Sequence, residues 1–207
     1  MAKVEPTIYV VDDDPSVRDA LQNLLEAVGM RAVLYGSTQE FLDARRPDAP
    51  SCLILDVRLP GMGGLELQEE LKKSGVPIPV VFITAHGDIP MTSRAIKAGA
   101  VEFLTKPFEK KDLLAAVTQA LERDRERRTA QAKLGAIRTR YESLTPRERE
   151  VLWEVVSGKT NKEIAGLLDL SEITVKIHRG RAMEKMQADS LADLVRMSEK
   201  IQARFRK

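Results

Sequence analysis

The segment Ile8-Tyr-Val-Val-Asp-Asp-Asp-Pro-Ser16 passes from an apolar run directly into three consecutive carboxylates. Asp14 has a structural explanation, because Asp at the N-cap followed by Pro at the first helical position is a standard helix start. Asp12 and Asp13 have none, although like charges within about 4 Å repel by about 1 kcal/mol even in water. Open α/β sheets bind ligands at the carboxyl ends of their strands. The segment therefore predicts a strand, a helix start and a cation site in one place.

Apolar runs and amphipathic stretches alternate through the first part of the chain. The runs lie at 8–11, 32–34, 52–55, 80–83 and 102–104, and the helical patterns lie near 15–28, 37–44, 64–74, 89–98 and from 111 onward. Five such βα units predict a doubly wound, flavodoxin-like parallel sheet of five strands with helices on both faces. Val80-Val-Phe-Ile83 is apolar throughout, as expected of a strand buried on both sides.

The rest of the chain has helical signals only. Residues 111–143 contain no Pro and a single Gly, which predicts one long linker helix. Its apolar seam is expected to pack against the neighbouring domain as a marginal interface that is easily shifted; the seam is Leu134, Ile137, Tyr141 and Leu144. Capping boxes at Thr145-Pro-Arg-Glu148 and Thr160-Asn-Lys-Glu163, with helix starts at Ser171 and Ser190, predict four short helices with a helix-turn-helix arrangement. The expected domains are 1–122, a linker at 123–142, and 143–207.

Composition favours a folded cytoplasmic protein without a membrane-spanning segment. The chain is 43% hydrophobic, and no apolar run approaches the roughly 18 residues that a membrane span needs. The N-terminus lacks signal-peptide features, and with Cys52 as the single cysteine no intrachain disulfide is possible. Residues 1–122 carry a net charge of −5 and residues 123–207 a net charge of +7. This asymmetry suggests a polyanion partner for the second half, and a solvated basic surface is the alternative.

The polar residues at the predicted strand ends have the composition of a phosphoryl-transfer site. Asp12 and Asp13 follow the first strand, Asp56 ends the third, Thr84 ends the fourth, and Lys106 follows the fifth. Mg²⁺ prefers one or two carboxylates with phosphate oxygens and water. A carboxylate can act as the nucleophile that forms an acyl phosphate, and a lysine can balance charge on the phosphoryl oxygens.

Four segments resemble the receiver domain of two-component response regulators. They are Val10-Val-Asp-Asp13, Leu53-Ile-Leu-Asp-Val-Arg-Leu-Pro-Gly61, Ile83-Thr-Ala85 and Phe103-Leu-Thr-Lys-Pro107. The resemblance implies that Asp56 is phosphorylated by a sensor histidine kinase. It also implies that Asp13, Asp56 and the main-chain carbonyl of Arg58 hold Mg²⁺, with Asp12 assisting through water.

The same resemblance implies three further roles. Lys106 would contact the phosphoryl oxygens, with a cis bond before Pro107, while Thr84 and Phe103 would form the switch pair that reports phosphorylation to the surface around the fourth helix and fifth strand. The run His86-Gly-Asp-Ile-Pro-Met91 is typical of the FixJ-like branch, and His86 is interpreted as structural. Aspartyl-phosphate phosphatases of the haloacid dehalogenase type are the enzymatic alternative. They carry Asp-x-Asp, whereas Arg58 stands in place of the second carboxylate here, so we expect no enzyme.

The C-terminal segments resemble the LuxR/FixJ-type helix-turn-helix domain. They are Leu144-Thr-Pro-Arg-Glu-Arg-Glu-Val-Leu152, Asn161-Lys-Glu-Ile-Ala165 and Thr174-Val-Lys-Ile-His178. The helix from Glu172 is expected to enter the major groove of double-stranded promoter DNA. Candidate DNA contacts are Lys162, Thr174, Lys176, Ile177, Arg179, Arg181 and Lys185. Gly180 departs from relatives that carry a basic residue there, and a mid-helix Gly costs roughly 1 kcal/mol relative to Ala.

Together these features predict a response regulator that controls transcription. Its expected partners are a sensor histidine kinase, promoter DNA and, upon phosphorylation, a second copy of the chain, and RNA polymerase is a further candidate. A protein of another class remains as an alternative, namely a receiver-based interaction switch whose C-terminal domain binds DNA weakly or not at all.

Overall fold

The structure, a computed structural model, describes residues 5–85 and 87–205, with side chains up to Gln202. His86, interpreted above as structural, lies outside the described residues. The chain divides into two compact units, Met1–Arg128 and Thr129–Lys207, and each is described by itself. No helix among the described residues is both long enough and apolar enough to cross a membrane.

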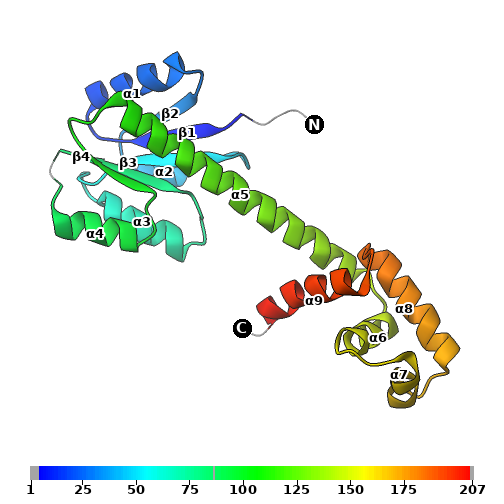
Figure 1. Cartoon of the computed structure of the whole chain (residues 1–207). Helices are drawn as coiled ribbons and strands as arrows, with labels where there is room; N and C mark the ends of the chain where they lie inside the picture. The colour runs from blue at the N-terminus through cyan, green and yellow to red at the C-terminus, as the bar shows by residue number, and fades with distance from the viewer. Residues whose placement is uncertain (1–4, 86, 206–207) are drawn as a thin grey trace. The chain divides into compact units, whose positions relative to one another are not determined.

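The first unit alternates strands and helices as the sequence predicts (Figure 1). Its elements are β1 (Thr7–Val11), α1 (Pro15–Ala27), β2 (Arg31–Tyr35), α2 (Thr38–Asp43), β3 (Ser51–Asp56), α3 (Gly64–Lys73), β4 (Val80–Thr84), α4 (Ile89–Lys97), β5 (Glu102–Thr105) and the beginning of α5 (Lys110–Glu142). Within the described residues the strands form a five-stranded parallel sheet in the order β2-β1-β3-β4-β5. The doubly wound fold is confirmed.

Helices cover both faces of this sheet. Alternate side chains of each strand point to opposite sides, so every strand contributes to two cores. On one side Val10 and Ile54 pack with Leu25 of α1 and Leu113 of α5. On the other side lies a second core that the sheet shares with α2, α3 and α4; it includes Tyr9, Leu55, Phe82, Phe41, Leu67 and Ala95. The continuous apolar character of β3 and β4 follows from this double burial.

The second unit is helical, as expected. In the part of the chain that the structure describes, four helices follow α5: α6 (Pro146–Val156), α7 (Asn161–Leu168), α8 (Glu172–Met186) and α9 (Leu191–Phe205). The predicted starts are present, with capping boxes at Thr145 and Thr160 and side-chain caps at Ser171 and Ser190. Each cap satisfies backbone N–H groups that the first helical turn leaves without a partner.

The apolar seam at the end of α5 belongs to the core of this second unit. Ile137 and Leu144 are 7% and 3% exposed and pack with Val151 and Leu152. Tyr141 packs edge-on against Trp153 and accepts a hydrogen bond from its Nε1 at 3.0 Å. Packing of Ile137, Tyr141 and Leu144 against the C-terminal domain is confirmed, whereas Leu134 is half-buried and lies outside this core. The interpretation of the seam as a marginal, easily shifted interface is wrong for these three residues, because their side chains pack in a hydrophobic core.

Candidate functional site

Strand register brings the predicted site residues to one edge of the sheet. Val11 is paired with Leu55, and Asp56 is paired with Ile83. Asp12 therefore follows β1 at the level where Asp56 ends β3, and Thr84 ends β4 one residue beyond. Lys106 comes directly after β5, and the peptide bond between it and Pro107 is cis, as the resemblance predicts.

Lys106 joins two of the carboxylates. Its Nζ lies 2.7 Å from Oδ2 of Asp12 and 2.7 Å from Oδ2 of Asp56. Asp12 is 1% exposed and Asp56 is 7% exposed, so this ammonium group supplies the positive charge that buried carboxylates require. The remaining oxygens are also used: Oδ1 of Asp12 accepts the N–H of Asp14 at 3.0 Å, and Oδ1 of Asp56 accepts that of Arg58 at 2.8 Å.

Burial and neighbouring charges shift the pKa values of Asp12 and Lys106. Burial raises the pKa of Asp12 above its ordinary value, and the hydrogen bond from Lys106 offsets only part of that effect. Burial alone would lower the pKa of Lys106, but hydrogen bonds to Asp12 and Asp56 outweigh burial and raise it. Lys106 is therefore held in its charged form at neutral pH.

Two residues that the sequence interpretation missed shape the site. Arg18 on α1 donates from Nη1 to the main-chain oxygens of Asp12 and Asp13, at 2.7 and 3.0 Å, and so fixes the turn that carries both carboxylates. Gly64 begins α3 against the main chain of Asp56, where an added Cβ would lie 2.2 Å from the Asp56 carbonyl oxygen. Only glycine permits this close approach, and neither requirement is visible in local sequence periodicity.

Thr84 and Phe103 lie beneath the loop between β4 and α4. Thr84 is fully buried, and Phe103 is 9% exposed and packs against Phe82. A Cβ added at Gly87 in that loop would lie 3.0 Å from Phe103 Cε1 and 3.5 Å from Thr84 Cγ2. Gly87 therefore lies close to both predicted switch residues.

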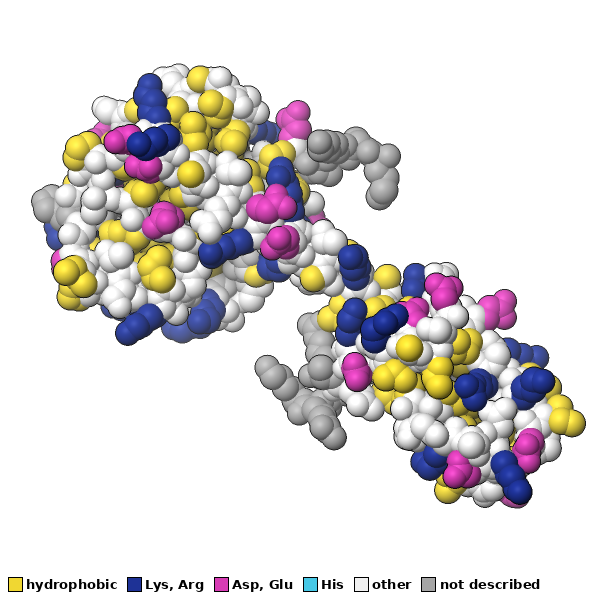
Figure 2. All heavy atoms as spheres, in the orientation of Figure 1, with side chains coloured by type: hydrophobic (Ala, Val, Ile, Leu, Met, Phe, Trp, Pro, Cys, Tyr) yellow, Lys and Arg dark blue, Asp and Glu magenta, His cyan; other side chains and the backbone are white. Residues whose placement is uncertain are grey.

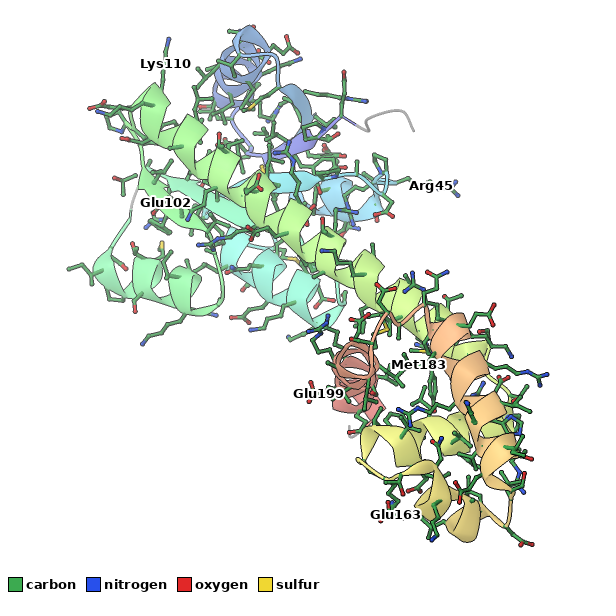
Figure 3. The ribbon with its side chains drawn as sticks, turned by 45° about the vertical axis from the view of Figure 1, so that its right-hand side comes forward. Arg45, Glu102, Lys110, Glu163, Met183 and Glu199 are labelled. Atoms are coloured by element: carbon green, nitrogen blue, oxygen red, sulfur yellow. The ribbon has the colours of Figure 1, made fainter. Side chains whose placement is uncertain are left out.

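In the second unit, α8 has one face buried in the core and an opposite face with exposed polar and apolar side chains. Val175, Ala182 and Met186 are buried in the core, and Met183, labelled in Figure 3, is partly buried against it. These side chains form the inward stripe of α8. Among the candidate DNA contacts, the exposed side chains are Lys162, Lys176, Ile177 and Arg181, and the partly buried ones are Thr174, Arg179 and Lys185.

Two of these basic side chains have partners within their own unit. Lys185 Nζ donates to Oε2 of Glu148 at 2.7 Å, and Arg179 Nη1 donates to Oδ1 of Asn161 at 3.1 Å. Glu148 is 2% exposed; burial alone would raise its pKa, but the hydrogen bonds from Lys185 and Thr145 outweigh burial and lower it. Lys185 thus neutralises a buried carboxylate rather than reaching outward as expected.

Comparison with known proteins agrees with both halves. Residues 8–118 match the family described as "Response regulator receiver domain", and residues 142–198 match "Bacterial regulatory proteins, luxR family". The chain belongs to the response regulators with a LuxR-type DNA-binding domain. It is a transcription regulator of a two-component system and not an enzyme.

Relatives of this response regulator match it over nearly its whole length. It is 52% identical to Nodulation protein W of Bradyrhizobium diazoefficiens, over 96% of this chain and 87% of the relative. It is 41% identical to the transcriptional regulatory protein FixJ of the same organism, over 92% of this chain and 93% of FixJ. A solved structure of the response regulator StyR is 50% identical, with a TM-score of 0.86 over 95% of this chain and 100% of StyR.

Proposed function

We propose that Asp56 of this response regulator accepts a phosphoryl group from a sensor histidine kinase, with Mg²⁺ held beside it. The observation that carries the proposal is the convergence of Asp12, Asp56 and Lys106, in which one ammonium group lies 2.7 Å from both carboxylates. The carboxylate of Asp56 would act as the nucleophile. Lys106 would remain charged and contact the phosphoryl oxygens once the carboxylate is modified.

The residues present fit a magnesium ion. Among the residues that the structure describes, no three acidic, His or Cys side chains form a metal-binding group. Mg²⁺ needs fewer protein carboxylates, because water and phosphate oxygens complete its coordination. Asp13, Asp56 and the main-chain carbonyl of Arg58 would hold the ion, with Asp12 assisting through water. When bound, the ion would neutralise charge on the phosphoryl group.

The direct test is intact-mass measurement after incubation with a small-molecule phosphodonor and Mg²⁺. Wild type should gain one phosphoryl group, and Asp56→Asn should gain none, because the amide is not a nucleophile for this transfer. Chelation of Mg²⁺ should abolish the gain in wild type. Asp43→Asn is a matched control, since Asp43 is an exposed carboxylate at the end of α2, and it should be labelled like wild type. Equal labelling of Asp56→Asn and wild type would exclude Asp56 as the acceptor.

We further propose that α8 enters the major groove of promoter DNA. Lys176, Ile177 and Arg181 would face the bases, whereas Lys162, Thr174 and Arg179 would contact phosphates, which position a domain without specifying sequence. Lys185 would reach a phosphate only by leaving Glu148. RNA polymerase is a further candidate partner, for which no surface is assigned.

Two lysines should separate these roles. Lys176→Ala should relax sequence preference at one base position, at a cost of about 1–3 kcal/mol in binding, whereas Lys162→Ala should weaken binding to all sequences and lower the salt slope by about one unit. Both side chains are exposed, so neither change should unfold the domain. Mobility shifts on genomic fragments at several salt concentrations measure both effects. If Lys176→Ala left sequence specificity intact, the proposed orientation of α8 toward the bases would be refuted. If wild type caused no mobility shift of any DNA fragment, the interaction-switch alternative would be favoured.

Communication between phosphorylation and output would use Thr84 and Phe103. Phosphorylation adds roughly two negative charges and new acceptor oxygens at Asp56. We propose that Thr84 moves toward the phosphoryl group, that Phe103 turns with it, and that the loop at Gly87, which lies close to both residues, shifts α4. The altered surface would favour a homodimer that binds two half-sites about one helical turn apart.

A further inference from the structure

The outward face of α8 is centred on an isoleucine that the proposed DNA contacts do not include. Ile173, the second residue of α8, is 73% exposed, and Ile177 is 48% exposed. Residues four apart lie on one face of a helix. Val175, Ala182 and Met186 occupy the opposite face, in the core. Ile173 therefore points directly away from its own domain.

The beginning of α8 holds this side chain in a defined position. Ser171 caps the helix by accepting the N–H of Thr174 at 3.1 Å, and the two hydroxyl oxygens lie 2.9 Å apart. Ile173 lies between these two residues. A β-branched side chain in a helix has one strongly preferred χ1 rotamer, so Ile173 presents its methyl groups in a nearly fixed direction.

Gly180 opens space on the same face of α8. A Cβ added there would meet no atom within 4 Å, so packing within the domain does not require glycine. A mid-helix Gly lowers helix stability relative to Ala. The outward stripe thus consists of two short, rigid isoleucines and a residue without a side chain, with the exposed Lys176 beside them. Such a surface can approach a partner closely, and Figure 2 shows hydrophobic side chains exposed among the charged ones on this unit.

The chemistry of the major groove supplies a matching apolar group. Thymine is the base that presents a methyl group there, at C5. Cβ atoms four residues apart on a helix are separated by about 5–6 Å, and base pairs rise about 3.4 Å per step. We propose that Ile173 packs against the C5-methyl of a thymine and that Ile177 contacts a second thymine one or two base steps away. This inference rests on the proposed entry of α8 into the major groove.

Deletion of single methyl groups from DNA tests the proposal. The full chain, treated with phosphodonor and Mg²⁺, first selects its binding sites from random duplex DNA. Each thymine of the selected half-site is then replaced by deoxyuridine, which removes only the methyl group. Loss of one buried methyl contact should weaken wild-type binding about fourfold at each of the two contacted thymines. At one of these positions Ile173→Ala should bind the thymine and uracil DNAs equally. Its salt slope should match that of wild type, because Ile173 contacts no phosphate.

Leu191→Ala is the matched control, since Leu191 is 41% exposed on α9 and should keep the full uracil effect. Equal thermal midpoints of Ile173→Ala and wild type would show that the exposed side chain is not needed for folding. A uracil effect that persists unchanged in Ile173→Ala at every thymine would overturn the inference while leaving groove entry intact. Failure of wild type to select any sequence would overturn groove entry as well.

Discussion

Asp124→Ala should lower the free energy of unfolding of the receiver unit by about 3 kcal/mol, because it breaks a buried ion-pair network. Asp124 lies on α5 and is 1% exposed. Its Oδ1 accepts from Arg127 Nη2 at 2.6 Å, and its Oδ2 accepts from Arg128 Nε at 2.7 Å. Oδ2 also accepts the N–H of Ser51 at 3.0 Å. The alanine variant would leave two cations and a buried N–H without this partner.

The effect belongs at the lower end of the range for a broken buried pair. The two arginine side chains remain 31% and 28% exposed, and Arg128 also pairs with Asp48, so water and a second carboxylate compensate in part. Ser51 is the first residue of β3, the strand that ends at Asp56. Loosening of this anchor should therefore appear first in β3 and α5.

Hydrogen exchange measured by mass spectrometry would locate the effect. Peptides from β3 and from residues 110–128 should lose protection in Asp124→Ala, and peptides from α6–α8 should not. Glu122→Ala is the matched control, because Glu122 forms an exposed ion pair with Arg125 at 3.3 Å, which should contribute less than about 1 kcal/mol. Protection of β3 equal to wild type in Asp124→Ala would show that the network does not stabilise the receiver unit.

The fold was predictable because its signals are local. Each strand is an apolar run, and several helices begin at a cap that the sequence shows directly, such as Asp14 before Pro15 or Thr145 with Glu148. The strand ends then place Asp12, Asp56 and Lys106 at one edge, since parallel strands share a direction. The shared position of these strand-end residues therefore follows from the alternating order of strands and helices.

Contacts between distant residues were not predictable. In the sequence, Asp124 is one charge in a highly charged linker. In the structure it accepts a hydrogen bond from Ser51, which is far away in the sequence. The first compact unit accordingly extends to Arg128, beyond the expected limit at 122. Lys185 was expected to be a basic side chain that points outward from α8, but it pairs with Glu148 of α6. Periodicity indicates which face is apolar, but it does not show which surface charges find a buried partner.

Phosphorylation of Asp56 should convert a mostly monomeric protein into a dimer through α4. Ile89 and Ile96 of α4 are 86% and 45% exposed, and their separation of seven residues places them on one face of the helix. Ala95, in contrast, is buried in the receiver core. Gly87 lies close to Thr84 and Phe103 in the loop that leads directly into α4, so a shift of that pair should reach this apolar face.

The size of the switch depends on how differently the two states bind a partner. A ligand shifts an equilibrium only by its differential affinity, and an inversion from 1:99 to 99:1 needs about 5.5 kcal/mol. The seam at Ile137 and Leu144 cannot supply this difference without opening the core of the second unit. The exposed isoleucines of α4 can, because their burial in a dimer would remove apolar surface from water at no cost to either core.

Sedimentation with and without phosphodonor, at concentrations that bracket the micromolar range, tests this switch. Wild type should double its mass upon phosphorylation, whereas Ile96→Asp should gain the phosphoryl group by intact mass and remain monomeric, because the introduced carboxylates would be buried against each other. Val28→Asp is the matched control, since Val28 is 46% exposed at the end of α1, and it should dimerise like wild type. Dimerisation of Ile96→Asp would show that the interface is not on α4.

An unchanged mass distribution of phosphorylated wild type would exclude switching by dimerisation. Phosphorylation would then have to act within a single chain, which leaves release of the DNA-binding domain as the mechanism.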